Sequence, residues 1–145
     1  MPADRPQAPG YLANLMARLF HEVAEEGLAP LGIRPEQFPM LAALWYGAGE
    51  LSLDEFQSLH EVSPAQIDAL VRGMVADGIV EKFPSSRREK IVLTPKAMAA
   101  RDGAVGAAVR ANKAATQVLT PPEMEQFMAM MNRVIDALQR AKSPG

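Results

Sequence analysis

Three basic side chains crowd one short segment of the chain: Arg87, Arg88 and Lys90 follow the turn-forming sequence Pro84-Ser85-Ser86. Directly upstream, the stretch from Ser63 to Gly78 has the start signal and apolar spacing of a helix. A helix followed by a basic hairpin suits the reading of duplex DNA, because the helix fits the major groove and the hairpin reaches the adjacent backbone or minor groove. These residue types in this order predict a contact with double-stranded DNA.

The outward edge of the predicted Ser63 helix carries the side chains suited to base edges and phosphates. Gln66 is suited to reading adenine, and Arg72 to reading guanine or holding a phosphate. Arg87 is expected at the minor groove or a phosphate, while Arg88 and Lys90 add general phosphate attraction. The predicted DNA-binding set is Ser63, Ala65, Gln66, Ala69, Arg72, Arg87, Arg88 and Lys90.

Each of these features also has a purely structural explanation. Any surface helix exposes polar residues, and helix capping alone explains Ser63. The side chain of Gln66 can be used in the same cap. A charged hairpin tip such as Arg87-Arg88 also serves solubility. The sequence leaves these alternatives open.

The distribution of charge favours the same region. The net charge of the 145-residue chain is −2 at pH 7, which argues against a general binder of polyanions. Residues 10–62 hold two basic and eight acidic side chains, a net of −6, whereas residues 63–96 hold six basic and four acidic ones, a net of +2. Local fields steer a ligand more than the total charge does, so this modest contrast favours a nucleic-acid contact at residues 63–96.

Composition indicates an ordinary soluble protein without a catalytic or metal site. Hydrophobic residues make up 48% and charged residues 22%. No apolar run approaches the roughly 20 residues that span a bilayer. The absence of cysteine excludes disulfides and thiolate zinc sites, and the two histidines, His21 and His60, are far apart. We therefore expect no enzyme activity, no metal, no cofactor, no membrane partner and a cytoplasmic location.

Helix start signals and apolar periodicity define the expected elements. Capping boxes begin at Ser52, Ser63 and Thr120, Thr94-Pro95 is a plainer start, and Pro39 should distort the first turn of its helix. Helices are expected over about 10–28, 35–49, 63–78, 95–117 and 121–141, with strands over 79–83 and 90–93. A further helix is expected to begin at Ser52, with His60 late in it.

This order predicts a mainly α fold with a small β-hairpin. Residues 35–94 would form a winged helix-turn-helix, the DNA-binding region, after a flexible tail over residues 1–9. The N-terminal helix within 10–34 and the C-terminal helices within 95–145 have apolar faces and no sheet to cover them. A twofold homodimer in which these dimerisation helices interlock is the economical solution.

Several short sequence segments follow one another along the chain, and their joint order and spacing are more specific than any one segment. They are Leu31-Gly32-Ile33, Gln37-Phe38, Leu41-Ala42-Ala43-Leu44, Val62-Ser63-Pro64-Ala65, Asp77-Gly78-Ile79-Val80-Glu81-Lys82, Val92-Leu93-Thr94-Pro95-Lys96 and Leu119-Thr120-Pro121-Pro122-Glu123. From about residue 11 to residue 138 the chain resembles the MarR family of bacterial winged helix-turn-helix transcription regulators. The resemblance implies a dimeric repressor or activator on a pseudo-palindromic operator, released by a small aromatic or phenolic ligand.

The resemblance also implies a ligand cavity between the winged helix-turn-helix region and the dimerisation helices. Its expected lining is Tyr11, His21, Met40, Trp45 and Tyr46, for which ordinary core packing is the alternative.

The DNA-reading segment departs from the family pattern. Ser85 stands where the family usually has an Asp two residues before its wing Arg, and Phe56-Gln57 stand where it usually has Leu-Ala. His60 occupies a usually apolar position, and Asp68 faces outward on the reading helix. These departures motivate a second hypothesis: a winged-helix dimer that has lost specific DNA binding and acts as a protein-interaction module.

Overall fold

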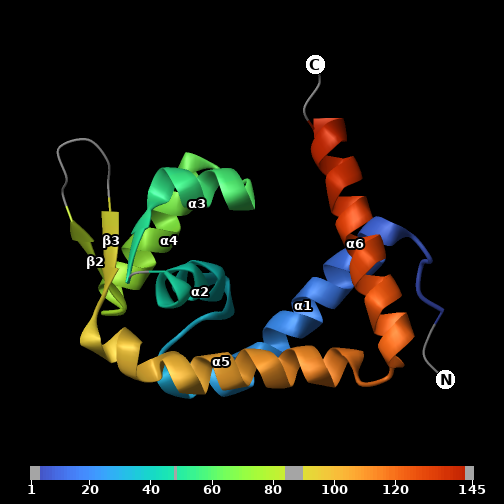
Figure 1. Cartoon of the computed structure of the whole chain (residues 1–145), viewed down its shortest axis with the longest axis horizontal. Coiled ribbons are helices and arrows are strands. Elements are labelled where there is room, and N and C mark those ends of the chain that lie inside the picture. The colour runs from blue at the N-terminus through green and yellow to red at the C-terminus, as the bar shows by residue number, and fades with distance from the viewer. Residues whose placement is uncertain (1–3, 48, 84–89, 143–145) are drawn as a thin grey trace. The chain divides into compact units, whose positions relative to one another are not determined.

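The computed structural model describes residues 4–47, 49–83 and 90–142 (Figure 1). The chain divides into two compact units, residues 1–111 and residues 112–145. The elements are α1 (Pro9–Leu28), the 3₁₀ turns η1 (Ala29–Leu31) and η2 (Pro35–Gln37), α2 (Phe38–Tyr46), β1 (Glu50–Ser52), α3 (Leu53–His60), α4 (Pro64–Ala76), β2 (Val80–Phe83), β3 (Lys90–Leu93), α5 (Pro95–Thr116) and α6 (Pro121–Lys142).

The second predicted helix is divided in two, as its proline suggested. Residues Pro35–Gln37 form the 3₁₀ turn η2, and the regular helix α2 begins only at Phe38, with Pro39 in its first turn. Proline has no backbone N–H to donate, and its ring restricts the residue before it, so the distortion falls just upstream of Pro39.

The sheet has a strand that the sequence analysis missed. The order is β1-β3-β2, both pairings are antiparallel, and β3 lies in the centre. In β1, Glu50 pairs with Val92 and Ser52 with Lys90. The predicted two-stranded hairpin is therefore incomplete, because β1 pairs with β3 as a third strand. At three residues, β1 is too short to show the alternation of apolar and polar residues that predicts a strand.

Ser52 also differs from its prediction. The helix α3 does begin at Leu53, but the Ser52 side chain makes no capping hydrogen bond. Its hydroxyl oxygen is buried and bonds to no described atom. Pairing of Ser52 with Lys90 places it at the end of a strand, so the capping box expected there is wrong.

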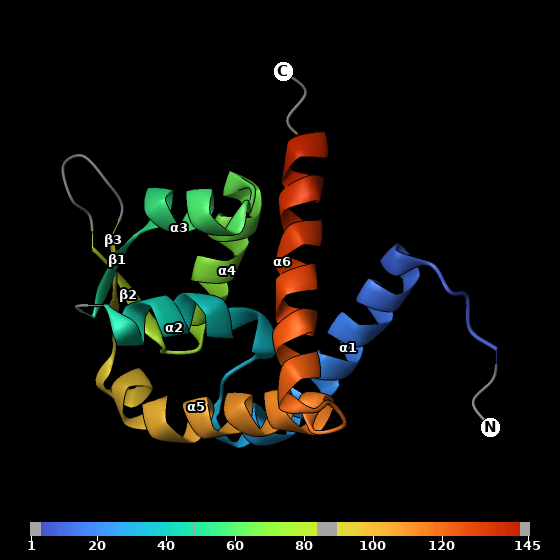
Figure 2. The same ribbon diagram turned by 45° about the vertical axis from the view of Figure 1, so that its right-hand side comes forward.

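The core of the first unit lies among α2, α4, the sheet and the start of α5. Figures 1 and 2 show α2 between α5 on one side and α3 with α4 on the other. Within this core the Trp45 indole N–H donates to the Ala97 carbonyl at 3.1 Å, which joins α2 to α5. The most deeply buried large side chains are Leu28, Met40, Leu41, Leu44, Met74, Ile79, Ile91, Gln37, Val71 and Val80.

Small residues bring α1 close to α5. A Cβ added to Gly27 would lie 2.6 Å from the Ala107 Cβ, closer than atoms can approach. Ala104 and Ala107 are buried on the facing side of α5. The alanine-rich character of α5 thus has a packing reason, because short side chains allow the two backbones to approach.

The second unit, residues 112–145, contains the end of α5 and the whole of α6. The predicted capping box is confirmed: the Thr120 N–H donates to Glu123 Oε1 at 2.8 Å, and the Glu123 N–H donates to Thr120 Oγ1 at 3.3 Å. Hydrogen bonds from the Thr120 backbone N–H and then from its side chain lower the pKa of the Glu123 carboxyl. No described residue of α6 is buried within the chain.

Candidate nucleic-acid interface

The start of α4 is fixed by a capping box, as the sequence predicted. The Gln66 N–H donates to Ser63 Oγ at 3.2 Å, and the Ser63 N–H donates to Gln66 Oε1 at 3.0 Å. Pro64 occupies the first helical position, where the missing N–H costs nothing. Gln66 therefore uses its amide oxygen in the cap.

The predicted division of α4 into an inner and an outer face agrees with its burial. Ile67, Val71 and Met74 are buried, so they anchor the helix to the core. The residues predicted to contact DNA on the outer edge are all exposed: Ser63, Ala65, Gln66, Ala69 and Arg72.

Arg72 and Asp68 lie one turn apart on this exposed edge. The Arg72 Nε donates to the Asp68 carbonyl oxygen at 3.4 Å. The Asp68 carboxylate is exposed as well and would repel phosphates. The outer edge of α4 thus offers a cation and an anion side by side.

The predicted wing is described only at its base. The strands β2 and β3 are paired from Val80–Leu93 at one end to Phe83–Lys90 at the other. Lys90 Nζ lies 3.3 Å from Glu50 Oε1, so its charge is partly neutralised by the neighbouring strand β1. Arg87, Arg88 and Ser85 lie outside the described residues, and their predicted roles stay predictions.

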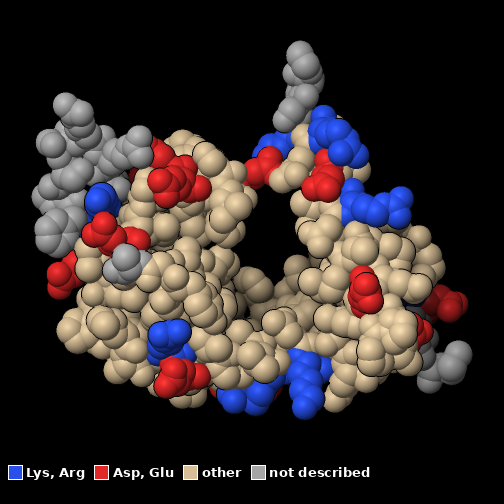
Figure 3. All heavy atoms as spheres, in the orientation of Figure 1, with Lys and Arg blue, Asp and Glu red and all other residues tan. Residues whose placement is uncertain are grey.

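Acidic side chains gather on α3, beside α4. Asp54 and Glu55 are exposed in its first turn, and Glu61 follows its last residue. Figure 3 shows carboxylates on the surface where Figure 1 places α3. His60 stacks on the Phe56 ring, with the ring centroids 4.1 Å apart, and its Nδ1 lies 3.2 Å from the Phe56 carbonyl.

The opposite end of α4 is closed by a Schellman motif. Gly78 has φ +72°, a conformation that favours glycine. The Ile79 N–H donates to the Met74 carbonyl at 2.9 Å, and the Gly78 N–H donates to the Val75 carbonyl at 3.0 Å. Ile79 and Met74 are both fully buried, which supplies the apolar contact that accompanies this motif.

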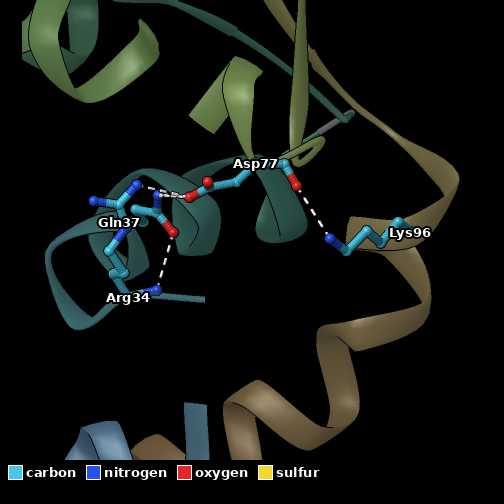
Figure 4. A network of polar contacts seen from close by, with 4 residues as sticks. All are labelled: Arg34, Gln37, Asp77 and Lys96. Atoms are coloured by element: carbon cyan, nitrogen blue, oxygen red, sulfur yellow. Dashed lines mark hydrogen bonds and ion pairs between the residues drawn. The ribbon is translucent and has the colours of Figure 1, made fainter. Parts of the chain in front are cut away.

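A polar network surrounds Asp77, the C-cap residue of α4 (Figure 4). The Arg34 guanidinium donates to Asp77 Oδ2 at 2.9 Å, and the Gln37 amide donates to the same oxygen at 3.0 Å. From the other side, Lys96 Nζ donates to the Asp77 carbonyl at 3.0 Å. The hydrogen bonds from Arg34 and then Gln37 lower the pKa of the Asp77 carboxyl below its ordinary value.

Gln37 is the buried polar member of this network, with 1% of its surface exposed. Its amide oxygen accepts from the Arg34 N–H at 3.0 Å while its amide nitrogen donates to Asp77. Both ends of the amide are satisfied, which is the condition for burying it without a large penalty. No sequence pattern predicts that Arg34, Gln37, Asp77 and Lys96 form a group. Residues 34 and 77 are 43 positions apart, so no local pattern joins them.

The five residues predicted to bind a ligand occupy two different environments. Met40 and Trp45 are buried in the core of the first unit. Tyr11 and Tyr46 are 47% and 69% exposed, and His21 is exposed on α1. The Arg101 guanidinium lies 5.7 Å from the centroid of the Tyr46 ring.

A separate cavity of about 450 Å³ opens beside α4, among the start of α2, the end of α3 and α4 itself. Phe56, His60 and Leu70 form apolar walls, and Arg34 and Gln66 supply polar groups. None of the five residues predicted to bind a ligand lines this cavity.

The described residues contain no group of three or more His, Asp or Glu side chains placed to hold a metal ion. Within the same ranges, no helix combines the length and the apolar character that crossing a bilayer requires.

Solved structures of other proteins resemble this chain in fold. The chain matches no protein-family model. No curated protein matches its sequence significantly. A structure of S. aureus MepR in complex with DNA superposes with a TM-score of 0.83 at 17% identity, covering 92% of this chain and 99% of that chain.

Two further solved structures have the same fold. A MarR transcriptional regulator from Methanosarcina mazei Go1 superposes with a TM-score of 0.78 at 14% identity, covering 90% of this chain and 94% of that chain. A mutant MarR from E. coli complexed with operator DNA has a TM-score of 0.76 at 21% identity, covering 86% of this chain and 91% of that chain. The chain therefore has the MarR-type winged-helix fold, and its described residues form six α-helices and a three-stranded antiparallel sheet.

Proposed function

We propose that this protein is a dimeric, DNA-binding transcription regulator in which α4 enters the major groove. The exposed outer edge of α4 is the main support for the proposal: Gln66, Ala69 and Arg72 are exposed along a helix whose start is fixed by a capping box. The base of a β-hairpin, β2–β3, follows this helix in the chain, and the segment between the strands holds Arg87 and Arg88. Fold relatives captured on DNA, MepR and MarR, add support.

The proposed dimer rests on exposed apolar side chains of two helices, α1 and α6. On α1, Tyr11, Leu19 and Val23 are each more than 40% exposed. On α6, the exposed apolar residues recur at helical spacing, so they form one stripe along the helix. They are Met128, Val134, Ile135 and Leu138. Contiguous apolar surface of this kind marks a protein interface, and a second copy of the chain is the occupant that we propose.

A small aromatic or phenolic ligand that releases the DNA completes the proposal, with the protein acting as a repressor in the cytoplasm. This part rests on the resemblance in sequence. The cavity of about 450 Å³ beside α4 supports it, because that volume suits a small organic molecule and a ligand there would touch the reading helix itself.

Fluorescence anisotropy tests the proposal directly. Labelled genomic fragments, including the region upstream of the protein's own gene, are titrated at several salt concentrations. We expect one fragment to bind far better than random DNA, with affinity that falls steeply as salt rises. Arg87→Ala should weaken this binding while the dimer persists in sedimentation. Equal binding to every fragment would rule out a specific regulator.

The exposed carboxylates favour one other function. Asp54 and Glu55 on α3 and Asp68 on α4 surround the proposed interface with negative charge. A winged-helix dimer that binds a basic protein partner would use such a surface without DNA. In the same experiment this alternative predicts no preference for any fragment and weak binding that does not depend on Arg72 or Arg87.

A further inference from the structure

The C-terminal end of α4 is held from two sides by polar contacts, whereas its first turn meets the core through the apolar side chain of Ile67. On one side, Arg34 and Gln37 reach the Asp77 carboxylate from the turn that follows α1. On the other side, Lys96 in the first turn of α5 donates to the Asp77 carbonyl. Figure 4 shows Asp77 between these two groups.

Thr94 adds a second attachment from the start of α5. Its hydroxyl lies 2.6 Å from the Gly78 carbonyl, and its N–H donates to the Ile79 carbonyl at 3.1 Å. The end of the reading helix is therefore bonded both to the α1–α2 connection and to the first turn of α5. These two attachments belong to the same compact unit, residues 1–111.

The acidic side chain of Asp77 indicates that its contacts serve to join α4 to other elements. A carboxylate at a helix C-terminus faces the negative end of the helix dipole, so Asp77 does not stabilise α4 by itself. Its favourable interactions are with other elements. Hydrogen bonds restrict direction more tightly than apolar contacts do, and the buried amide of Gln37 has both of its ends committed.

The length of α4 turns a small rotation into a large displacement. Its 13 residues make a rod of about 20 Å. A tilt of about 10° about the C-terminal end of α4 would move the residues at its N-terminal end by about 3 Å, which is about the length of a hydrogen bond. Contacts with base edges would not survive such a shift.

We propose that Asp77 is a positioning residue that fixes the direction in which α4 projects from α5. This inference rests on the proposed function for its consequence in DNA binding: in a dimer, that direction sets the distance between the two reading edges and hence the half-site spacing that the protein accepts. Asp77 itself lies at the end of α4 remote from Ser63 and touches no base.

The first test needs neither DNA nor an operator. The chain has no cysteine, so Ala65→Cys on α4 and Met98→Cys on α5 introduce two unique labelling sites, both exposed. Pulsed spin-label measurements, with labelled chain diluted into unlabelled chain, give the distance between them. We expect one narrow distribution, and a distribution broadened or displaced by about 3 Å after Asp77→Asn. An unchanged distribution would overturn the inference.

Asp102→Asn is the matched control. Asp102 is an exposed residue of α5 that makes no side-chain hydrogen bond or ion pair with any described residue. It undergoes the same chemical change as Asp77→Asn without touching the end of α4. The label distance should stay as in the parent protein. Arg34→Met should reproduce the effect of Asp77→Asn, and the double variant should add little to either.

The second test uses DNA. The fragment bound best in the anisotropy experiment is rebuilt with one base pair inserted or deleted between its half-sites. The parent protein should discriminate sharply between the spacings, and Asp77→Asn should reduce that discrimination about threefold to tenfold. Thermal unfolding of each variant separates this effect from a simple loss of folded protein. Full discrimination in a folded Asp77→Asn variant contradicts the inference, whereas a parent protein without any preferred fragment contradicts the proposed function instead.

Discussion

Ser63 and Gln66 satisfy each other's backbone N–H groups at the start of α4, through bonds of 3.2 and 3.0 Å. The same side chains were predicted to meet DNA. In the free protein, the Gln66 amide oxygen is therefore occupied by the cap. Reading an adenine with both ends of that amide would require the cap to open, so the favourable contact with DNA competes with a bond that the helix already has.

Ser63→Ala should destabilise the protein by about 1 kcal/mol, because the Gln66 N–H loses its partner. Urea unfolding followed by circular dichroism measures the change. Ser58→Ala, at an exposed serine in α3, is the control and should change the free energy of unfolding by less than about 0.5 kcal/mol. Equal effects of the two substitutions would show that the cap contributes nothing.

Gly27→Ala should destabilise the protein by about 1–3 kcal/mol, since the added Cβ would overlap the Ala107 Cβ at 2.6 Å and force α1 away from α5. Gly106→Ala is the matched substitution. There the new methyl group meets only the end of the flexible Arg110 side chain, at 3.3 Å, so helix propensity should raise stability by up to about 1 kcal/mol. The two variants should shift the thermal midpoint in opposite directions; a shared direction would refute the packing argument.

Trp45→Phe should cost about 1–3 kcal/mol, because it leaves the buried Ala97 carbonyl without its indole donor. Chemical unfolding monitored by circular dichroism avoids dependence on the fluorescence of Trp45, the one tryptophan in the chain. Tyr46→Phe is the control at an exposed neighbouring residue and should have little effect. If Trp45→Phe unfolds at the same denaturant concentration as the parent protein, the hydrogen bond does not matter for stability.

Arg72→Ala and Asp68→Asn should change DNA affinity in opposite directions. Both residues are exposed on the edge proposed to face DNA, so removing the cation weakens binding and removing the anion strengthens it. Removing a phosphate contact should also lower the slope of log affinity against log salt by about 1. Anisotropy titrations at several salt concentrations check both effects, and an increase in affinity with Arg72→Ala would exclude this edge as the interface.

The network at Asp77 should make stability depend on pH. Because its pKa is lowered in the folded chain, the ionised carboxylate stabilises the fold at pH values above its ordinary pKa of 3.8. This contribution is lost as the pH falls through the lower, folded-state value. The difference in unfolding free energy between the parent protein and Asp77→Asn should therefore be constant above about pH 5 and shrink as the pH falls through 3.8 and below. The effect should be modest, because the Asp77 side chain is 31% exposed. A difference that does not vary with pH would contradict it.

Local signals in the sequence predicted local structure well. At Ser63 and Thr120, the capping residue and its partner are three positions apart, so the motif carries all the information that the geometry needs. Ser52 has the same pattern, yet its side chain makes no cap bond. There, pairing of Ser52 with Lys90, 38 positions away, decides the local geometry. A local motif cannot report this.

Of the candidate nucleic-acid interface, only the exposed residues of α4 could be predicted from the sequence. Exposure of Gln66 and Arg72 follows from the helical period that also buries Ile67 and Val71. The contacts at Asp77 depend on how η2, α4 and α5 meet, and that arrangement is a property of the whole fold. The residues proposed for the ligand show the same limit, because Met40 and Trp45 are apolar and equally suited to a core.

The helix α6 contains 22 residues, none of them buried. In proteins most of the stability of a helix comes from packing of its amphipathic face rather than from helix propensity, so covering the apolar stripe of α6 should stabilise this segment. If a second copy covers its apolar stripe, folding of the C-terminal segment becomes a bimolecular event. Its melting temperature would then rise with protein concentration, and dilution alone would begin to unwind it.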